Sequence, residues 1–253
     1  MIMRKNAREI EKMRRAGKIA AAARQLAGKM VTVGATTQSI NSRVHDFILS
    51  QGAVPAFLGY NGYPASICIS VNEQVIHGIP SGRVLADGDI VSIDIGVMKD
   101  GYIGDCSATF ITGNGSEESK RLIEVTRECF YEGLKFARVG YRVSDISRAI
   151  QRHAEKNGYS LVREYVGHGV GKKVHEPPEV PNFVETPRKK ADPRLLPGMT
   201  LAVEPMVNEG GAAIKIQDDG WTVVTADGRN SAHYENTILI TEGEPEVLTV
   251  CEV

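Results

Sequence analysis

The chain has 253 residues, of which 42% are hydrophobic and 24% charged, so one large domain or two small ones can form a substantial packed core. Its formal net charge of −1 provides no bulk field for nucleic acid or anionic lipid, and no nucleic-acid-binding motif is present. The sequence contains no run of about 18 apolar residues, so a membrane span is not expected.

The cysteines and the N-terminal residues indicate the compartment. The cysteines lack CxxC spacing, and Cys68, Cys106 and Cys129 lie in apolar runs, where free thiols behave as small hydrophobes; Cys251 is the fourth. This usage is typical of a reducing compartment. Residues 1–17 mix both signs of charge and lack the apolar segment of a signal peptide. We therefore expect a cytoplasmic protein.

Two helices are predicted at the start of the chain. Residues 7–30 carry apolar side chains near helical spacing among Arg, Lys and Glu. A second helix is expected to begin near Thr36 or Thr37 and to end at Gly52. Residues 65–112 are rich in strand-forming side chains, which predicts that a sheet follows these helices.

The segment DIVSIDIGVMKDGYIGDCSATFIT, residues 89–112, holds two acids inside apolar runs around a turn signal. A two-residue loop at Asp100-Gly101 would place Asp94 opposite residue 107, with Asp105 as its diagonal neighbour. A loop at Lys99-Asp100 would place the two acids directly opposite each other. Both registers leave the carboxylates on one face, roughly 5–8 Å apart. Because two shielded like charges need a cation between them, the hairpin predicts a metal site.

Two further helices follow. Ser116 is expected to cap a third helix that ends at Gly140, and Ser144 to cap a fourth that runs to Asn157-Gly158. Strands and turns are predicted from Tyr159 onward.

The two halves of the chain share a short, weak sequence similarity. LADGDIVSID (85–94) aligns without gaps with LLPGMTLAVE (195–204), so that Asp94 matches Glu204, and each half then supplies a second strand that begins with an acid. Chance is the alternative, because the shared turn residues are common before strands. We infer one catalytic domain, 1–253, with two related halves of about 1–115 and 116–253 that share a central sheet.

Five side chains form the candidate metal set: Asp94, Asp105, His168, Glu204 and Glu235. The glycines on both sides of the histidine allow its backbone to approach a neighbour closely. Four carboxylates and one imidazole do not suit a closed structural zinc site, but they suit two divalent ions of the Mn, Fe, Co or Zn series. An acid near a strand end is more often a turn residue, and a lone histidine between glycines is more often structural, so the prediction depends on all five residues together.

The remaining histidines divide into two groups. His77 and His175 precede turns near the ligand-bearing strands, and we interpret them as donors to a substrate carbonyl or oxyanion; histidines bonded to turn backbone are the alternative. His45 and His153 are interpreted as structural because they lie on predicted helices. His233 is also interpreted as structural, because it is expected to point off the face that carries Glu235.

Aromatic residues gather before the first strands. Phe57, Tyr60 and Tyr63 lie in AFLGYNGYPAS, and Trp221 is the only tryptophan. We interpret these rings as a pocket wall for an apolar side chain, with a core corner packed by tyrosines as the alternative.

Five stretches carry a family resemblance: GYPASICISVNEQVIHGIP, GDIVSIDIGVMKDGYIGDCSATF, REYVGHGVGKKVHEPP, LLPGMTLAVEPM and SAHYENTILI. They resemble the type I methionine aminopeptidases of bacterial form, which share the pita-bread fold with creatinase and prolidase. With the helices between them, the resemblance covers nearly the whole chain. It implies an α+β fold with pseudo-twofold halves and a central curved antiparallel sheet covered by helices.

The resemblance implies a role for each residue by position. Asp94 would chelate one metal, His168 and Glu204 the other, and Asp105 and Glu235 would bridge both. A metal-bridged hydroxide would attack the scissile carbonyl, and Glu204 would carry the proton to the leaving amine. The substrate contacts implied are His77 at the scissile nitrogen, His175 at the carbonyl oxygen, and Tyr60, Tyr63 and Trp221 around the methionine side chain.

Further expectations follow from the same resemblance. A monovalent-cation site would fall around Asn72, Gln74 and Ser231. Val174 replaces an aromatic that often closes the pocket, and Phe57 stands where a smaller residue is common, which indicates a compensating change of volume. The chain would be a monomer that removes the N-terminal methionine of nascent polypeptides, in association with the ribosome, and would favour small second residues.

Two other classes of protein are alternatives. X-Pro aminopeptidases and prolidases share the fold, but they resemble this chain only in the C-terminal half of longer proteins. A non-catalytic binding protein of the same fold would have lost ligands, whereas all five are present here.

Overall fold

The main element of the protein is a sheet of nine strands. The computed structural model describes residues 2–184 and 192–250. The sheet contains β1 (Val54–Pro55), β2 (Cys68–Val71), β4 (Ile90–Lys99), β5 (Tyr102–Ile111), β7 (Gly167–Gly169), β8 (Glu176–Val180), β9 (Thr200–Val203), β14 (Glu235–Leu239) and β15 (Glu246–Val247). Its order is β1-β4-β5-β14-β9-β7-β8, with β2 on β4 and β15 on β14, and the pairings are antiparallel.

Two three-stranded sheets complete the strand structure in the described part of the chain. One has the order β13-β10-β6 and the other β11-β12-β3. Their strands are β3 (Gln74–Ile76), β6 (Ser160–Leu161), β10 (Met206–Asn208), β11 (Ile214–Ile216), β12 (Val223–Thr225) and β13 (Ser231–His233). The pairing of β12 with β3 joins a strand from the first half of the chain to one from the second half.

The first two helices confirm the sequence prediction. α1 spans Ala7–Met30 and α2 spans Thr37–Ser50. Asn6 caps α1 through a reciprocal pair, because its Oδ1 accepts from the Glu9 backbone N–H (3.1 Å) while its own N–H donates to Glu9 Oε2 (2.9 Å). Thr36 Oγ1 caps α2 by accepting from a backbone N–H of the first turn.

The second pair of helices confirms the prediction only in part. α3 spans Glu117–Leu134 and begins after the Ser116 cap, as expected, but it ends six residues before the predicted stop at Gly140. There the chain tightens, and the Phe136 N–H donates to the carbonyl of Gly133 (3.0 Å). Gly133 also lies against α4, so the last turn is defined by packing that a linear pattern does not show.

The predicted cap of the fourth helix was wrong. α4 spans Val143–Lys156, so Ser144 lies inside its first turn. Asp145 closes the helix start by accepting from the Arg142 N–H (2.9 Å), while the backbone and hydroxyl of Ser144 both donate to Asp192. Ser144 is therefore hydrogen-bonded to an aspartate that is distant in sequence, and local spacing cannot predict this contact.

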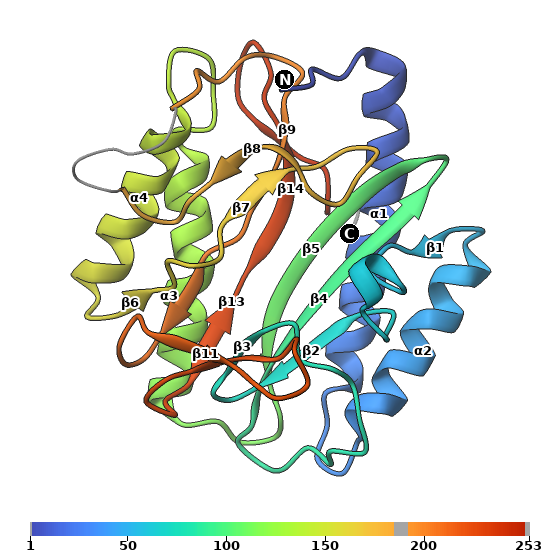
Figure 1. Ribbon diagram of the computed structural model, residues 1–253, viewed down its shortest axis with the longest axis vertical. Coiled ribbons are helices and arrows are strands. Elements are labelled where there is room, and N and C mark those ends of the chain that lie inside the picture. The colour runs from blue at the N-terminus through green and yellow to red at the C-terminus, as the bar shows by residue number, and fades with distance from the viewer. Residues whose placement is uncertain (1, 185–191, 251–253) are drawn as a thin grey trace.

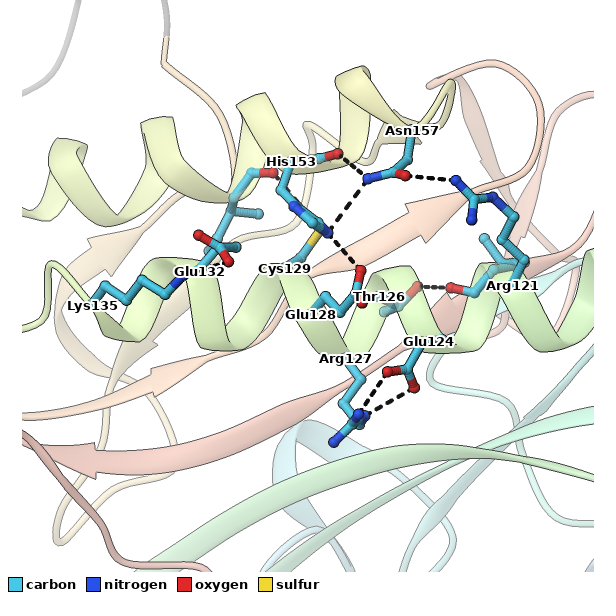
Figure 2. Close-up of polar contacts among 12 residues, drawn as sticks. Arg121, Glu124, Thr126, Arg127, Glu128, Cys129, Glu132, Lys135, His153 and Asn157 are labelled. Atoms are coloured by element: carbon cyan, nitrogen blue, oxygen red, sulfur yellow. Dashed lines mark hydrogen bonds and ion pairs between the residues drawn. The ribbon is translucent and has the colours of Figure 1, made fainter.

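Polar contacts connect α3 with α4 (Figure 2). His153 Nε2 lies 2.8 Å from Glu128 Oε2, and Arg121 donates to Asn157 Oδ1 at 2.7 Å. Beneath them the buried thiol of Cys129 approaches the Ile150 carbonyl at 3.8 Å. His153 therefore joins two helices, as the structural interpretation expected. His45, on α2, lies 2.7 Å from the Ser66 hydroxyl.

The β4–β5 hairpin has the two-residue loop. Lys99 pairs with Tyr102, and the loop residues Asp100 and Gly101 have φ angles of 51° and 77°, which a primed hairpin turn requires. Asp94 faces Ser107 in this register. The alternative loop at Lys99-Asp100 is therefore wrong.

Each helix pair covers one half of the sheet (Figure 1). α1 and α2 share a buried cluster with β2 and β4 that includes Ile93 and Ile95, whereas α3 and α4 share another with β9 and β14. Because side chains alternate along a strand, Asp94 lies on the face of the sheet away from α1 and α2. Of the helices in the described ranges, none combines the length and the apolar character that crossing a membrane requires.

Candidate metal centre

All five predicted ligands line one cavity of about 240 Å³. Asp94 and Asp105 come from β4 and β5, His168 from β7, and Glu235 begins β14, while Glu204 directly follows β9. The register explains their convergence, because Glu235 pairs with Ser107, two residues beyond Asp105 on the same face of β5. Residues far apart in sequence are thus brought to the middle of one sheet.

The glycines around His168 permit this convergence. A Cβ on Gly167 would lie 2.5 Å from the Ala202 carbonyl oxygen, and one on Gly169 would collide with the carbonyl of Pro177. β7 therefore fits between β8 and β9 only because its flanking residues have no side chain. The result is a buried imidazole whose Nδ1 faces its neighbour's carbonyl at 2.9 Å and whose Nε2 lies 3.3 Å from Glu204 Oε1.

The ligand atoms lie close enough to share cations. One atom each from Asp105, His168 and Glu235 falls within 4.8 Å of the other two. The buried oxygens Asp94 Oδ1, Asp105 Oδ1 and Glu235 Oε1 have no hydrogen-bond partner among the described residues. A buried carboxylate oxygen without a donor is unfavourable, and a divalent cation removes that penalty. The oxygen-rich set with one imidazole nitrogen fits divalent ions of the first transition series.

Burial sets the protonation of the acids. It raises the pKa of Asp94 to about 6, and burial together with Asp94 raises the pKa of Asp105 well above its ordinary value. Burial and the Asp105 charge do the same to the pKa of Glu235. These three carboxyls therefore retain protons in the metal-free protein at pH values where free carboxyls are ionised.

Glu204 and His168 behave in the opposite way. Burial would raise the pKa of Glu204, but contacts with His168 and His233 hold it at about 2. Burial would lower the pKa of His168, yet the hydrogen bond to Glu204 raises it to about 9. In the metal-free state the two form an ion pair inside the cavity.

The two candidate substrate histidines also line the cavity. His77 adopts a φ of 59°, which is unusual for a non-glycine residue, and its ring meets Tyr165 edge-on with centroids 5.5 Å apart. Burial lowers its pKa. The His175 ring centroid is 4.2 Å from that of His168, and burial and then His168 lower the pKa of His175 to about 4. Both rings are neutral near pH 7, when each keeps one N–H donor.

Aromatic side chains form one wall of the cavity. Tyr63 and Trp221 meet edge-on with centroids 5.1 Å apart, and Phe57 packs against the bare backbone of Gly96. Val174 and Phe57 belong to the same packed cluster and both line the cavity. The predicted compensation between these two residues is compatible with their shared position and stays a prediction.

One interpretation from the sequence was wrong. His233 does not point away from the site: it is buried, and its Nε2 lies 3.6 Å from Glu204 Oε2. β13 pairs with β10, so that His233 faces Met206, two residues beyond Glu204. The prediction treated His233 and Glu235 as residues of one strand with alternating side chains. They lie on different strands of different sheets, so the alternation does not apply.

The sequence reading also missed three lining residues: Asn61, Cys68 and Tyr165. Cys68 pairs with Asp94 across β2 and β4. Its place in the cavity could therefore be predicted only if the pairing of β2 with β4 was already known. Tyr165 precedes His168 by three residues within the histidine motif. The other two cysteines in the described residues, Cys106 and Cys129, are buried and are not disulfide-bonded, as expected, and Cys251 lies outside the described residues.

The residues predicted to surround a monovalent cation lie near one another. The Ser231 N–H donates to the Asn72 carbonyl at 3.0 Å, and the Gln74 side chain accepts from the Val71 N–H at 2.9 Å. A cation at this place stays a prediction.

Comparisons with known proteins agree on one family. The model described as metallopeptidase family M24 matches residues 11–242. A Clostridium perfringens protein named methionine aminopeptidase is 52% identical over 99% of this chain and 99% of its own length. Methionine aminopeptidase 1 of Bacillus subtilis is 50% identical over 98% of this chain and 99% of its own length. The crystal structure of methionine aminopeptidase from Rickettsia prowazekii superposes with a TM-score of 0.95 at 41% identity, covering 99% of this chain and all of that one.

Proposed function

The chain belongs to metallopeptidase family M24, with its pita-bread α+β fold, and we propose that it is a methionine aminopeptidase that removes the N-terminal methionine from polypeptides. The relatives at 50–52% identity, matched over nearly their whole length, carry that name. The observation that carries the proposal for this chain is the cavity itself. Five metal-type side chains, two neutral histidines and an aromatic wall meet in about 240 Å³.

The metal ligands proposed are Asp94, Asp105, His168, Glu204 and Glu235. Their unpartnered buried oxygens and mixed oxygen–nitrogen chemistry fit two divalent ions of the Mn, Fe, Co or Zn series. When bound, such ions supply a water molecule of lowered pKa and positive charge beside the scissile carbonyl.

The proton transfers are assigned to Glu204. Beside divalent cations its carboxylate would be ionised near neutral pH, so it can accept a proton from the attacking water. The same oxygen can then pass that proton to the amine that leaves. Glu204 therefore combines ligation with general acid–base work.

The two substrate histidines stabilise the reacting peptide bond. A neutral imidazole offers one N–H donor, and we assign that donor in His77 to the scissile nitrogen and in His175 to the carbonyl oxygen as charge develops on it. Tyr60, Tyr63 and Trp221, with Phe57 and Val174, enclose the side chain of the leaving methionine. Small residues at the second position would be favoured, because a bulky side chain there would meet the rim of the pocket.

The setting of the reaction is part of the proposal. The substrates would be nascent chains in the cytoplasm, reached in association with the ribosome, and the enzyme would act as a monomer. The buried cysteines, which are not disulfide-bonded, are compatible with a reducing compartment.

A pair of peptides tests the function. The purified chain, loaded with Mn²⁺ or Co²⁺, should release methionine from Met-Gly-Met, should leave an Xaa-Pro peptide intact, and should stop when a chelator is added. Cleavage of only the Xaa-Pro peptide would make the protein a proline-specific relative. Metal-independent peptide binding without turnover would make it a binding protein.

A further inference from the structure

Tyr60 does more in this cavity than provide a wall. Its Oη lies 2.7 Å from Nδ1 of His175, and the two rings are 5.4 Å apart at a tilt of 37°. A wall residue that contacts only an apolar side chain needs no hydroxyl in this place. The hydroxyl is instead directed at one nitrogen of the histidine assigned to the carbonyl oxygen.

The choice of nitrogen has a chemical consequence. A neutral imidazole carries its proton on one nitrogen and a lone pair on the other, and the hydrogen bond at one nitrogen selects the form. A tyrosine hydroxyl that donates to Nδ1 leaves the proton on Nε2. Since Nδ1 is occupied by Tyr60, Nε2 is the ring nitrogen that remains for the cavity, and in this form it is a donor. The opposite form would present a lone pair to a carbonyl oxygen and would repel it.

The backbone around Tyr60 is held in place for this contact. Gly59 and Gly62 have φ angles of 78° and 88°, and Asn61 between them has 48°, so left-handed residues stand on both sides of Tyr60. The Gly59 N–H donates to the Tyr63 carbonyl (2.8 Å), and the Tyr63 N–H donates to the Tyr60 carbonyl (2.9 Å). A non-glycine residue in this region is an uncommon conformation that is retained where the surroundings define it.

The loop that carries His175 is anchored as well. The next residue, Glu176, accepts from the Lys5 ammonium at 2.7 Å and from the backbone N–H groups of Lys172 and Lys173. Both partners of the ion pair are nearly buried, with 6% and 11% of their side chains exposed. Tyr60 and His175 therefore approach each other from two fixed loops, which favours one defined hydrogen bond over a chance contact.

We propose that Tyr60 is a positioning residue whose hydroxyl donates to Nδ1 of His175 and holds this ring as the Nε2–H tautomer, the form that donates to the substrate carbonyl oxygen. The inference rests on the role of His175 under the proposed function. It adds to the wall role of Tyr60 an effect on kcat that acts through a second residue.

The tautomer is measured directly by NMR. In protein with ¹⁵N-labelled histidine, loaded with zinc and also metal-free, the His175 signals are identified by their loss in His175→Ala. Nε2 should show one-bond coupling to hydrogen and Nδ1 should not. In Tyr60→Phe, the Nδ1 signal should lose the displacement caused by a hydrogen-bond donor. A proton on Nδ1 in the wild type, or identical spectra in the variant, would overturn the proposal. Tyr60→Leu removes the same hydroxyl if the phenylalanine variant does not fold.

Kinetics separate positioning from packing. Tyr60→Phe keeps the ring, so KM for a methionyl peptide should stay within about twofold while kcat falls roughly 10-fold, the size expected for one neutral hydrogen bond. Tyr141→Phe, which removes a hydroxyl outside the cavity, should leave kcat unchanged. In a His175→Ala background the Tyr60 substitution should have no further effect on kcat. If the kcat losses of the two single variants multiply in the double variant, or if Tyr60→Phe raises only KM, Tyr60 would act only as part of the cavity wall.

The two proposals fail in distinguishable ways. If the wild-type enzyme releases no methionine, the proposed function is wrong, whereas the nitrogen spectrum still reports the tautomer. If methionine is released but the spectrum shows the opposite tautomer, only the role of Tyr60 is wrong.

Discussion

At the scale of single residues, the site depends on acids placed in strands that are otherwise apolar. Asp94 lies between Ile93 and Ile95, which are buried against the helices, while its own side chain enters the cavity. Three such carboxyls lack donors for a buried oxygen within the described residues, and their pKa values are raised accordingly. The activity of the site should therefore be sensitive to substitution of any one of these acids.

Glu204→Gln should reduce turnover by roughly 10²–10⁴-fold, because the amide preserves the shape but cannot accept the proton. The variant should remain folded, as judged by circular dichroism and its melting temperature. Glu242→Gln, an exposed change on the same side-chain type, is the matched control and should keep full activity. Unchanged methionine release by the Glu204 variant would remove this residue from the reaction.

His175→Ala should lower kcat by roughly 10²-fold or more, the loss expected when one donor to a developing oxyanion is removed. Steady-state kinetics with a methionyl peptide measure it. His153→Ala removes an imidazole from the helix surface shown in Figure 2 and should leave kcat unaltered. A rise in KM without a fall in kcat would place His175 in ground-state binding instead.

At the scale of elements, the close approach of α1 to the hairpin depends on Gly104. A Cβ on Gly104 of β5 would lie 2.5 Å from the backbone nitrogen of Gly17 on α1. The atoms that this Cβ would meet belong to the helix backbone, which cannot move aside as the end of a flexible side chain can. The absence of a side chain at Gly104 therefore fixes how closely the first helix packs behind the strands that carry Asp94 and Asp105.

Gly104→Ala should lower the free energy of unfolding by about 2–3 kcal/mol, because overpacking forces α1 away from β5. Chemical denaturation of the metal-loaded protein measures this loss. Gly82→Ala is the control, since a Cβ there meets no atom within 4 Å and the backbone is not left-handed; its stability should match the wild type. Equal stabilities for both variants would contradict the close approach.

At the scale of the whole molecule, removal of the metals should destabilise the protein more at pH 8 than at pH 5.5. Asp94 has a pKa raised to about 6, so its contribution is favourable at low pH and is lost as pH rises from about 4 to 6. The pKa of His168, raised to about 9, gives stability that is present below about 6.5 and lost toward pH 9. The low pKa of Glu204 matters only below about 4.5.

The measurement is the difference in melting temperature with and without chelator at the two pH values. Protons replace part of the missing positive charge at pH 5.5 but not at pH 8, so the difference should widen as pH rises. The metal-loaded protein serves as its own control at each pH. A difference that is equal at both values, or larger at pH 5.5, would contradict the assignment of these acids as ligands.

Local patterns predicted the elements well where the signals were themselves local. The start of α1 follows from helical spacing and the starts of α2 and α3 from capping residues, and the Asp100-Gly101 turn confines the hairpin to one register once its strands pair. The predicted end of α3 and the predicted start of α4 were wrong, because Gly133 packs on another helix and Ser144 donates a hydrogen bond to Asp192. The division into two related halves stays a prediction.

The sequence by itself determined which side chains are the candidates for the chemistry. Acids within apolar strands, a histidine between glycines and a ring-rich loop are visible without coordinates, because burying charge in a strand requires a reason. Only the tertiary structure decided which atoms meet: that His233 turns toward Glu204, that Cys68 and Tyr165 enter the cavity, and that Tyr60 faces Nδ1 of His175. The physical reason is that strand periodicity specifies the face on which a side chain lies, whereas contacts between strands and loops distant in sequence depend on register and packing.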